Sequence, residues 1–194
     1  MLAWARGARG ATRSIQSFIY GIDELLRWRA VEALGKVCAL RAETDLQAVR
    51  NLLRQLFWSM NDESGGTGWH SPEAIGEILL NIPGLIDEYG KLMVPFFHEE
   101  PFERGAYFAV ARLAGIKPEF FMEFREELAA AVGTPDPYIK GYAVMALVAL
   151  DGVSALDEER IRILKNDETL LTMYDFHAGT LNKISIKEIA GALK

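Results

Sequence analysis

The sequence has one cysteine, Cys38, and three histidines, which narrows the chemistry open to it. A single thiol excludes an intramolecular disulfide and a cysteine-based metal cluster, and it agrees with a reducing cytoplasm. Because Cys38 lies in the apolar run 37–40, we interpret it as a small buried hydrophobe. His70, His98 and His177 form no ligand pair at helical spacing. We therefore predict no metal site and no cofactor.

The sequence also lacks long apolar runs and an excess of basic residues. No segment approaches the roughly 20 apolar residues that a membrane-spanning helix needs. The formal net charge of −6 argues against a protein that coats nucleic acid or an anionic membrane, since both demand positive surface. No Ser/His/Asp or Cys/His set has a defensible spacing, so we assign no catalytic residues. We expect a soluble, cytoplasmic protein that binds neither nucleic acid nor membrane, and we favour a function other than catalysis.

What the sequence does contain is helical periodicity along almost its whole length. Apolar residues recur every three or four positions, and Gly, Pro, Asn and Asp separate the runs. Ser71-Pro72-Glu73 and Asp136-Pro137 are helix starts, with Ser71 and Asp136 as the expected N-caps. No alternating strand stands out, and the fold class is all-α. We predict helices at 13–20, 23–41, 44–60, 72–81, 84–97, 102–114, 118–131, 136–150, 157–165 and 168–176, with a weaker one at 185–193.

Parts of this helical pattern repeat. The order acid, proline, aromatic, any residue, base, glycine occurs at 100–105 and again at 136–141, which is 36 residues later. The pattern Ala-Val-x-Ala-Leu is identical at 30–34 and 143–147, with a looser copy at 74–78. Alanines at i and i+3 lie on one side of a helix, so that a neighbouring helix can approach closely. The repetition predicts helices that stack in a row.

The segment 136–147, Asp-Pro-x-Ile-Lys-x-x-Ala-Val-x-Ala-Leu, resembles the second helix of a HEAT repeat, in the subclass related to phycobilisome-lyase HEAT-like repeats. The resemblance covers roughly 22–150 as about four repeats. It implies an α-α superhelix, a short solenoid of about four helix pairs plus capping helices. We expect one domain, 1–194, with 1–21 as an N-terminal cap or frayed helix and 151–194 as a C-terminal cap. HEAT arrays serve as scaffolds in many processes, so a protein partner is expected.

One loop departs from the repeat. Between the alanines at 30 and 74 the spacing grows to 44 residues, and the additional length includes the glycine-rich segment 58–73, which has a tryptophan near each end. Its 61–69 stretch is similar to one in a bacterial HEAT-like family of unassigned function. Glycines there allow a tight turn or a close approach to a ligand. Our candidate binding residues are Trp58, Asn61, Asp62, Glu63, Gly66, Trp69 and His70.

Four interpretations of this loop stay open. Asn61, Asp62 and Glu63 offer oxygens to a hard cation, although their spacing is not that of an EF-hand. The segment 66–71 precedes a helix start and would suit an anion, but it lacks the lysine of a P-loop. In a purely structural interpretation the tryptophans pin the loop to the array and the acids cap helices. Alternatively, Trp58 and Trp69 dock a protein partner, since tryptophan is enriched at binding hot spots.

The function that follows is a non-catalytic protein-binding scaffold, with the 58–73 loop as its functional surface. The alternative is an enzyme or a small-molecule or metal-binding protein with its site at the same loop, lyase-like by analogy with the repeat subclass. A DNA-repair module of the helical-repeat type is least favoured, because the chain is acidic and has no basic stripe. The oligomeric state is not predicted.

Overall fold

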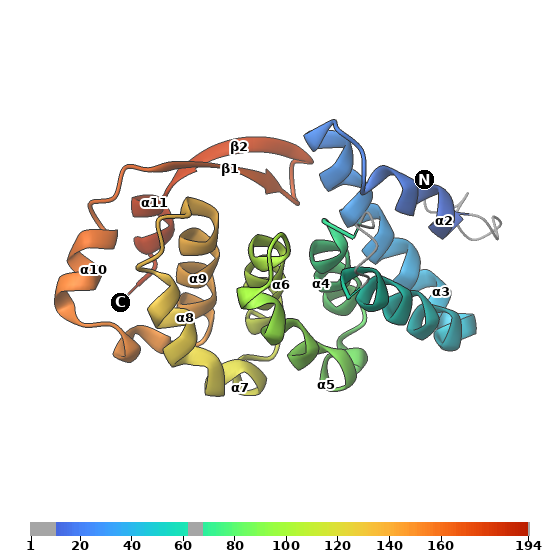
Figure 1. Cartoon of the computed structure of the whole chain (residues 1–194), viewed down its shortest axis with the longest axis horizontal. Coiled ribbons are helices and arrows are strands. Elements are labelled where there is room, and N and C mark those ends of the chain that lie inside the picture. The colour runs from blue at the N-terminus through green and yellow to red at the C-terminus, as the bar shows by residue number, and fades with distance from the viewer. Residues whose placement is uncertain (1–10, 62–67, 194) are drawn as a thin grey trace. The chain divides into compact units, whose positions relative to one another are not determined.

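The computed structural model describes residues 11–61 and 68–193 of the chain, and these divide into two compact units, Met1–Ala109 and Val110–Lys194 (Figure 1). Both units are mainly helical, and the second also holds a two-stranded sheet. Among the described residues, no helix combines the length and the apolar character needed to cross a bilayer.

The first unit is built from helices only, within the described residues. It contains α2 (Ala11–Phe18), α3 (Glu24–Met60), α4 (Ser71–Asn81), η1 (Pro83–Leu85), α5 (Ile86–Tyr89), η2 (Gly90–His98) and most of α6 (Glu103–Ala114). The helix predicted at 84–97 is thus three short pieces, two of them 3-10 helices.

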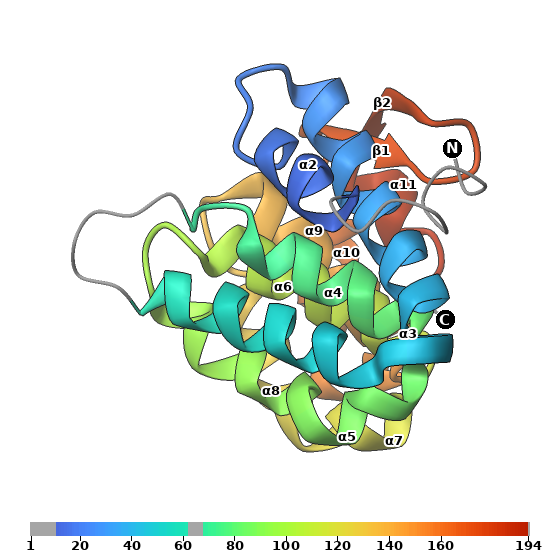
Figure 2. The same cartoon turned by 90° about the vertical axis from the view of Figure 1, so that its right-hand side faces the viewer.

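Helix α3 is bent into two legs that match the helices predicted at 23–41 and 44–60. The bend lies at Asp45, whose φ of −150° and ψ of 69° are not helical. Asp23 caps the first leg by accepting a hydrogen bond from Leu26 N at 2.7 Å, and Asp45 caps the second by accepting one from Ala48 N at 3.0 Å. Each leg therefore begins with its own aspartate, and the bend places α4 against both legs (Figure 2).

Small residues allow close packing in this unit. A methyl group added at Gly35 would lie 2.6 Å from the backbone oxygen of Glu77 on α4, and one added at Gly76 would lie 2.8 Å from Cβ of Ala109 on α6. The repeat alanines Ala30 and Ala74 are buried. Ala33, the second alanine of the first copy, is only half-buried, and the close approaches between helices are at the glycines.

The second unit contains α7 (Pro118–Phe121), η3 (Met122–Phe124), α8 (Arg125–Ala131), α9 (Pro137–Ala149), η4 (Gly152–Ala155), α10 (Glu158–Leu164), β1 (Leu170–Asp175), β2 (Thr180–Ser185) and α11 (Ile186–Ala190). Helices α8 and α9 pack side by side (Figure 1). The predicted N-cap Asp136 is confirmed, because its carboxylate accepts hydrogen bonds from Tyr138 N and Ile139 N. Ala143 and Ala146 are fully buried.

The predicted helix at 168–176 is wrong, and so is the expectation of no strand. Residues 170–175 form β1, which pairs antiparallel with β2 from Leu170 opposite Ser185 to Asp175 opposite Thr180. The turn between them forms because Asp175 Oδ1 accepts hydrogen bonds from His177 N at 2.8 Å and Ala178 N at 3.0 Å. These two N–H donors also hold the pKa of Asp175 below its ordinary value. Gly179 supplies the positive φ of 69°.

The weaker helix predicted at 185–193 is confirmed as α11. It begins with a capping box, in which Glu188 N donates to Ser185 Oγ and the Glu188 carboxylate accepts from Ser185 N. Helix α11 and β1 then cover α9, where Leu171 Cδ2 lies 3.0 Å from the position of a methyl group at Gly141. A mixed cap of hairpin and helix therefore follows α9 in this unit.

Candidate functional site

The candidate site lies where α3 ends, at Met60, and α4 begins, at Ser71. Among the residues predicted from the sequence, Trp58, Asn61, Trp69 and His70 belong to this junction. Asp62, Glu63 and Gly66 lie outside the described residues. The cation and anion interpretations, which depend on them, therefore stay predictions.

Both tryptophans project into solvent. Trp58 is 68% exposed and Trp69 is 63% exposed, far more than is usual for so large an apolar side chain. The second leg of α3 buries a stripe formed by Leu52, Leu53 and Leu56, and Trp58 lies off that stripe. This exposure favours the docking interpretation of the tryptophans over the one in which they pin the loop to the helices. The acids of the pinning interpretation, Asp62 and Glu63, lie outside the described residues.

A pair of serines holds the junction together instead. Ser59 Oγ lies 3.1 Å from Ser71 Oγ, and Ser59 Oγ also donates to the backbone oxygen of Leu56 at 2.7 Å. A hydroxyl has one proton, so Ser71 is the donor to Ser59. The prediction that Ser71 is the N-cap of α4 is wrong: Ser71 is the first helical residue and is fully buried, with its hydroxyl bonded to Ser59. His70 takes the cap position, and its side chain accepts no hydrogen bond from the first turn of the helix backbone.

Gly68 brings the two backbones into contact beside the serines. A methyl group added at Gly68 would lie 2.6 Å from the backbone oxygen of Ser59. Trp58 precedes Ser59 and Trp69 follows Gly68, and neighbouring Cα atoms are only about 3.8 Å apart. The two exposed indoles therefore leave the protein from adjacent points of a fixed backbone.

Asn61 has a structural role at this junction. Its side-chain Nδ2 donates to the backbone oxygen of Phe57 at 2.9 Å, and its backbone N–H donates to that of Trp58 at 3.0 Å. These bonds satisfy carbonyl groups at the C-terminal end of α3, which have no partner within the helix. Asn61 thus ends the helix and keeps the turn that carries Trp58 in place.

His70 contacts a buried carboxylate, Glu73, that sequence reasoning treated only as a helix-start acid. The distance from His70 Nδ1 to Glu73 Oε1 is 3.2 Å. Glu73 is 8% exposed, and within the described residues its Oε2 has no hydrogen-bond partner. Because a methyl group at Gly105 would lie 2.5 Å from that oxygen, the glycine makes room for the carboxylate. The only sequence signal was Gly105 in the repeated motif, since the contact joins α4 to α6.

The described residues of the junction offer two exposed indole rings, hydrogen-bonding groups and the His70–Glu73 pair. Within residues 11–61 and 68–193, no group of three or more His, Cys, Asp or Glu side chains is placed to hold a metal ion. Cys38 is fully buried, as predicted, and burial raises the pKa of its thiol to about 12. At neutral pH that thiol is protonated and therefore a poor nucleophile.

Comparison with known proteins identifies a similar protein, whose function is not described. An uncharacterized protein of Archaeoglobus fulgidus is 29% identical over 172 residues, which is 87% of this chain and 88% of that protein. No protein-family model matches the sequence. At this coverage the similarity includes parts of both compact units, so it is not limited to one short motif.

Proposed function

We propose that this chain is a protein-binding scaffold of the HEAT-like type, which holds its partner at the α3–α4 junction through Trp58 and Trp69. The observation that carries the proposal is the exposure of two indole rings from adjacent points of an otherwise well-anchored backbone. Large aromatic side chains of this kind dominate the binding free energy of protein interfaces once they are buried by a partner.

The helical-repeat part of the proposal is supported by a correspondence between α3 and α9. Each helix begins at an aspartate that accepts hydrogen bonds from the first turn, Asp23 in α3 and Asp136 in α9. Seven residues after each aspartate comes a buried alanine, Ala30 or Ala143. The two copies of the sequence motif thus form the same local structure, as structural repeats do.

The surroundings of Trp58 indicate the partner's chemistry. Arg54 and Gln55, one helical turn earlier, are exposed on the same side of α3 as Trp58. An apolar centre with arginine and amide groups at its edge is the usual composition of a protein interface. The matching partner is a protein with an apolar pocket for an indole ring and hydrogen-bond acceptors beside it.

The partner is captured by placing the photo-crosslinking residue benzoylphenylalanine at position 69 and irradiating cells of the native host. The same residue at position 163 is the control, because Ile163 is 54% exposed and belongs to the second compact unit. Position 69 is expected to crosslink a specific protein that position 163 does not. An identical set of products from both positions would contradict the proposal.

The purified partner then allows a quantitative test by isothermal titration calorimetry. Trp69→Ala and Trp58→Ala are each expected to weaken binding by about 30-fold, which corresponds to a hot-spot loss of about 2 kcal/mol. Ile163→Ala is expected to leave the dissociation constant unchanged. If both tryptophan variants bind the partner with wild-type affinity, the junction is not part of the interface.

A further inference from the structure

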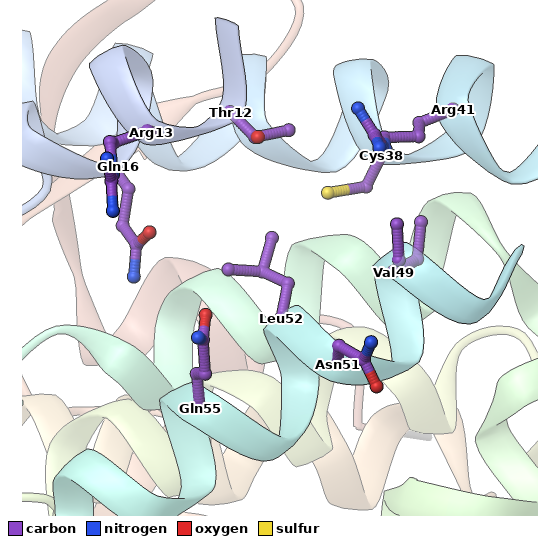
Figure 3. Close-up of a pocket in the computed structure, with 10 residues that line it drawn as sticks. Thr12, Arg13, Gln16, Cys38, Arg41, Val49, Asn51, Leu52 and Gln55 are labelled. Atoms are coloured by element: carbon purple, nitrogen blue, oxygen red, sulfur yellow. The ribbon is translucent and has the colours of Figure 1, made fainter. Parts of the chain in front are cut away.

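A second surface feature is a pocket between α2 and the two legs of α3 (Figure 3). Neither tryptophan lines it, although Gln55, on the same helix side as Trp58, does. Its volume is about 280 Å³, close to the lower end for small-molecule sites. The bend at Asp45 creates it, because the two legs diverge from that point and α2 covers the space between them.

The pocket is positively charged. Arg13 of α2 and Arg41 of the first leg both line it, and the described residues of its lining include no carboxylate. Of the two acids that follow Arg41 in the chain, Glu43 is exposed, and Asp45 accepts a hydrogen bond from Arg41 Nη2 at 3.2 Å while it also caps the second leg. Within the lining itself, the two guanidinium charges are not balanced by a carboxylate.

Asn51 adds a fixed donor. Its Oδ1 accepts hydrogen bonds from Gln47 Nε2 at 3.1 Å and from Arg54 Nη1 at 3.2 Å, both on the same helix leg. A carbonyl oxygen has two lone pairs, so this oxygen is fully used and the orientation of the amide is set. Figure 3 shows the result: the Asn51 nitrogen is turned toward the pocket and its oxygen away from it.

The inner side of the pocket is apolar. Leu52 and Cys38 both point into it from opposite legs (Figure 3), and each is at least nine-tenths buried. Since the thiol of Cys38 is neutral at physiological pH, it adds no negative charge that would repel an anion. The pocket thus has N–H donors and positive charge near an apolar inner surface.

We infer that this pocket binds a small organic anion, whose carboxylate or phosphate group lies among Arg13, Arg41 and Asn51 while a short carbon chain contacts Leu52 and Cys38. Guanidinium groups bind both kinds of anion through paired N–H donors. A free volume of about 280 Å³ limits the carbon chain to a few atoms.

The test is titration calorimetry on the full chain with butyrate, butyl phosphate and butanol, at constant ionic strength. Saturable binding of butyrate or butyl phosphate but not butanol is expected, and the tighter of the two identifies the anionic group. Inorganic phosphate is expected to bind more weakly than butyl phosphate, because it has no carbon chain. No saturable binding of either organic anion would overturn the inference.

A matched pair of variants locates the binding. Asn51→Asp keeps the oxygen that accepts from Gln47 and Arg54 but replaces the donor facing the pocket with a negative oxygen, and we expect binding at least tenfold weaker. Ser154→Asp changes the net charge equally at an exposed position outside the pocket lining, so affinity is expected within twofold of wild type. Arg13→Gln, at an exposed position, should weaken binding as well. Equal weakening by Asn51→Asp and Ser154→Asp would show a general charge effect and overturn the assignment.

Discussion

The two ends of α3 use the same residue type in opposite ways. Near its start, Trp28 is 9% exposed and its ring lies 5.0 Å from that of Phe108 on α6. Near its end, Trp58 is 68% exposed and is followed by a serine that anchors the turn. The number of tryptophans therefore does not predict a binding surface. The side of the helix on which each tryptophan lies does, because it decides whether the ring is buried or exposed.

The pattern around each ring shows this difference. Trp28 shares a helix side with the buried residues Val31 and Gly35, so it continues an apolar stripe. Trp58 shares one with the exposed residues Arg54 and Gln55, and therefore interrupts a polar side. An aromatic residue on a polar helix side is the signal that predicts a contact surface.

Replacing each tryptophan tests this contrast with the largest expected effect. Trp28→Ala should lower the free energy of unfolding by about 3–5 kcal/mol, since it leaves a cavity in the core. Trp58→Ala should change it by less than about 0.5 kcal/mol, because the ring is mostly in solvent already. Urea denaturation followed by circular dichroism measures both, and equal losses would break the comparison.

The close contact between α3 and α4 gives the next largest effect. Gly35→Ala is expected to cost about 1–3 kcal/mol, because the new methyl group would meet the Glu77 backbone oxygen at 2.6 Å. Gly84→Ala is the control, since no atom lies within 4 Å of its added methyl group. If Gly35→Ala melts at the wild-type temperature in a calorimeter, the two helices are farther apart than described.

Features that are determined by residues close together in the sequence could be predicted, and features that depend on distant residues could not. The interruption between the helices predicted at 23–41 and 44–60, the cap at Asp136 and the burial of Ala30 and Ala143 follow from neighbouring residues, and the structure has them. The strand β1 was mistaken for a helix because Leu170-Leu171-Thr172-Met173-Tyr174 is a short apolar run, for which periodicity does not separate the two. The turn residues Asp175 and Gly179 are typical of a β-hairpin and would have indicated one here.

The candidate site was predictable only in part for the same reason. The tryptophans and glycines of 58–73 singled out the segment, but the Ser59–Ser71 bond and the place of Glu73 beside Gly105 join different helices. No spacing rule reveals such contacts before the fold is known. The exposure of both rings was likewise not decided by the sequence, which left pinning and docking as alternatives.

The serine pair at the end of α3 is expected to have a smaller effect on stability than the glycine contact. Ser71→Ala removes the donor to Ser59, and a loss of about 0.5–1.5 kcal/mol is expected, the usual net value of one hydrogen bond. Ser154→Ala, at an exposed position, should be neutral. Thermal denaturation compares them, and a neutral Ser71→Ala would show that the junction is held by other contacts.

The smallest effect concerns pH. On the second leg of α3, the hydrogen bond from Arg50 at 2.9 Å is the main reason why the pKa of Glu88 lies below its ordinary value of 4.5. A carboxyl whose pKa is lowered by folding stabilises the protein above that value, and the contribution is lost as the pH falls through the lowered one. When the pH falls below about 4.5, the Glu88→Gln variant should therefore lose slightly less stability than the wild type does. Identical pH profiles of the melting temperature for wild type and variant would contradict the pairing.

The central claim, that the exposed tryptophans form the contact surface for a protein partner, is tested most directly by one dissociation constant. The partner found by crosslinking is purified, and its dissociation constant is measured for the Trp58→Ala/Trp69→Ala double variant and for wild type. Both proteins are measured at a temperature where they are folded. We expect binding at least 100-fold weaker, from the loss of two hot-spot side chains. A double variant that is folded and binds the partner as tightly as wild type would contradict the claim.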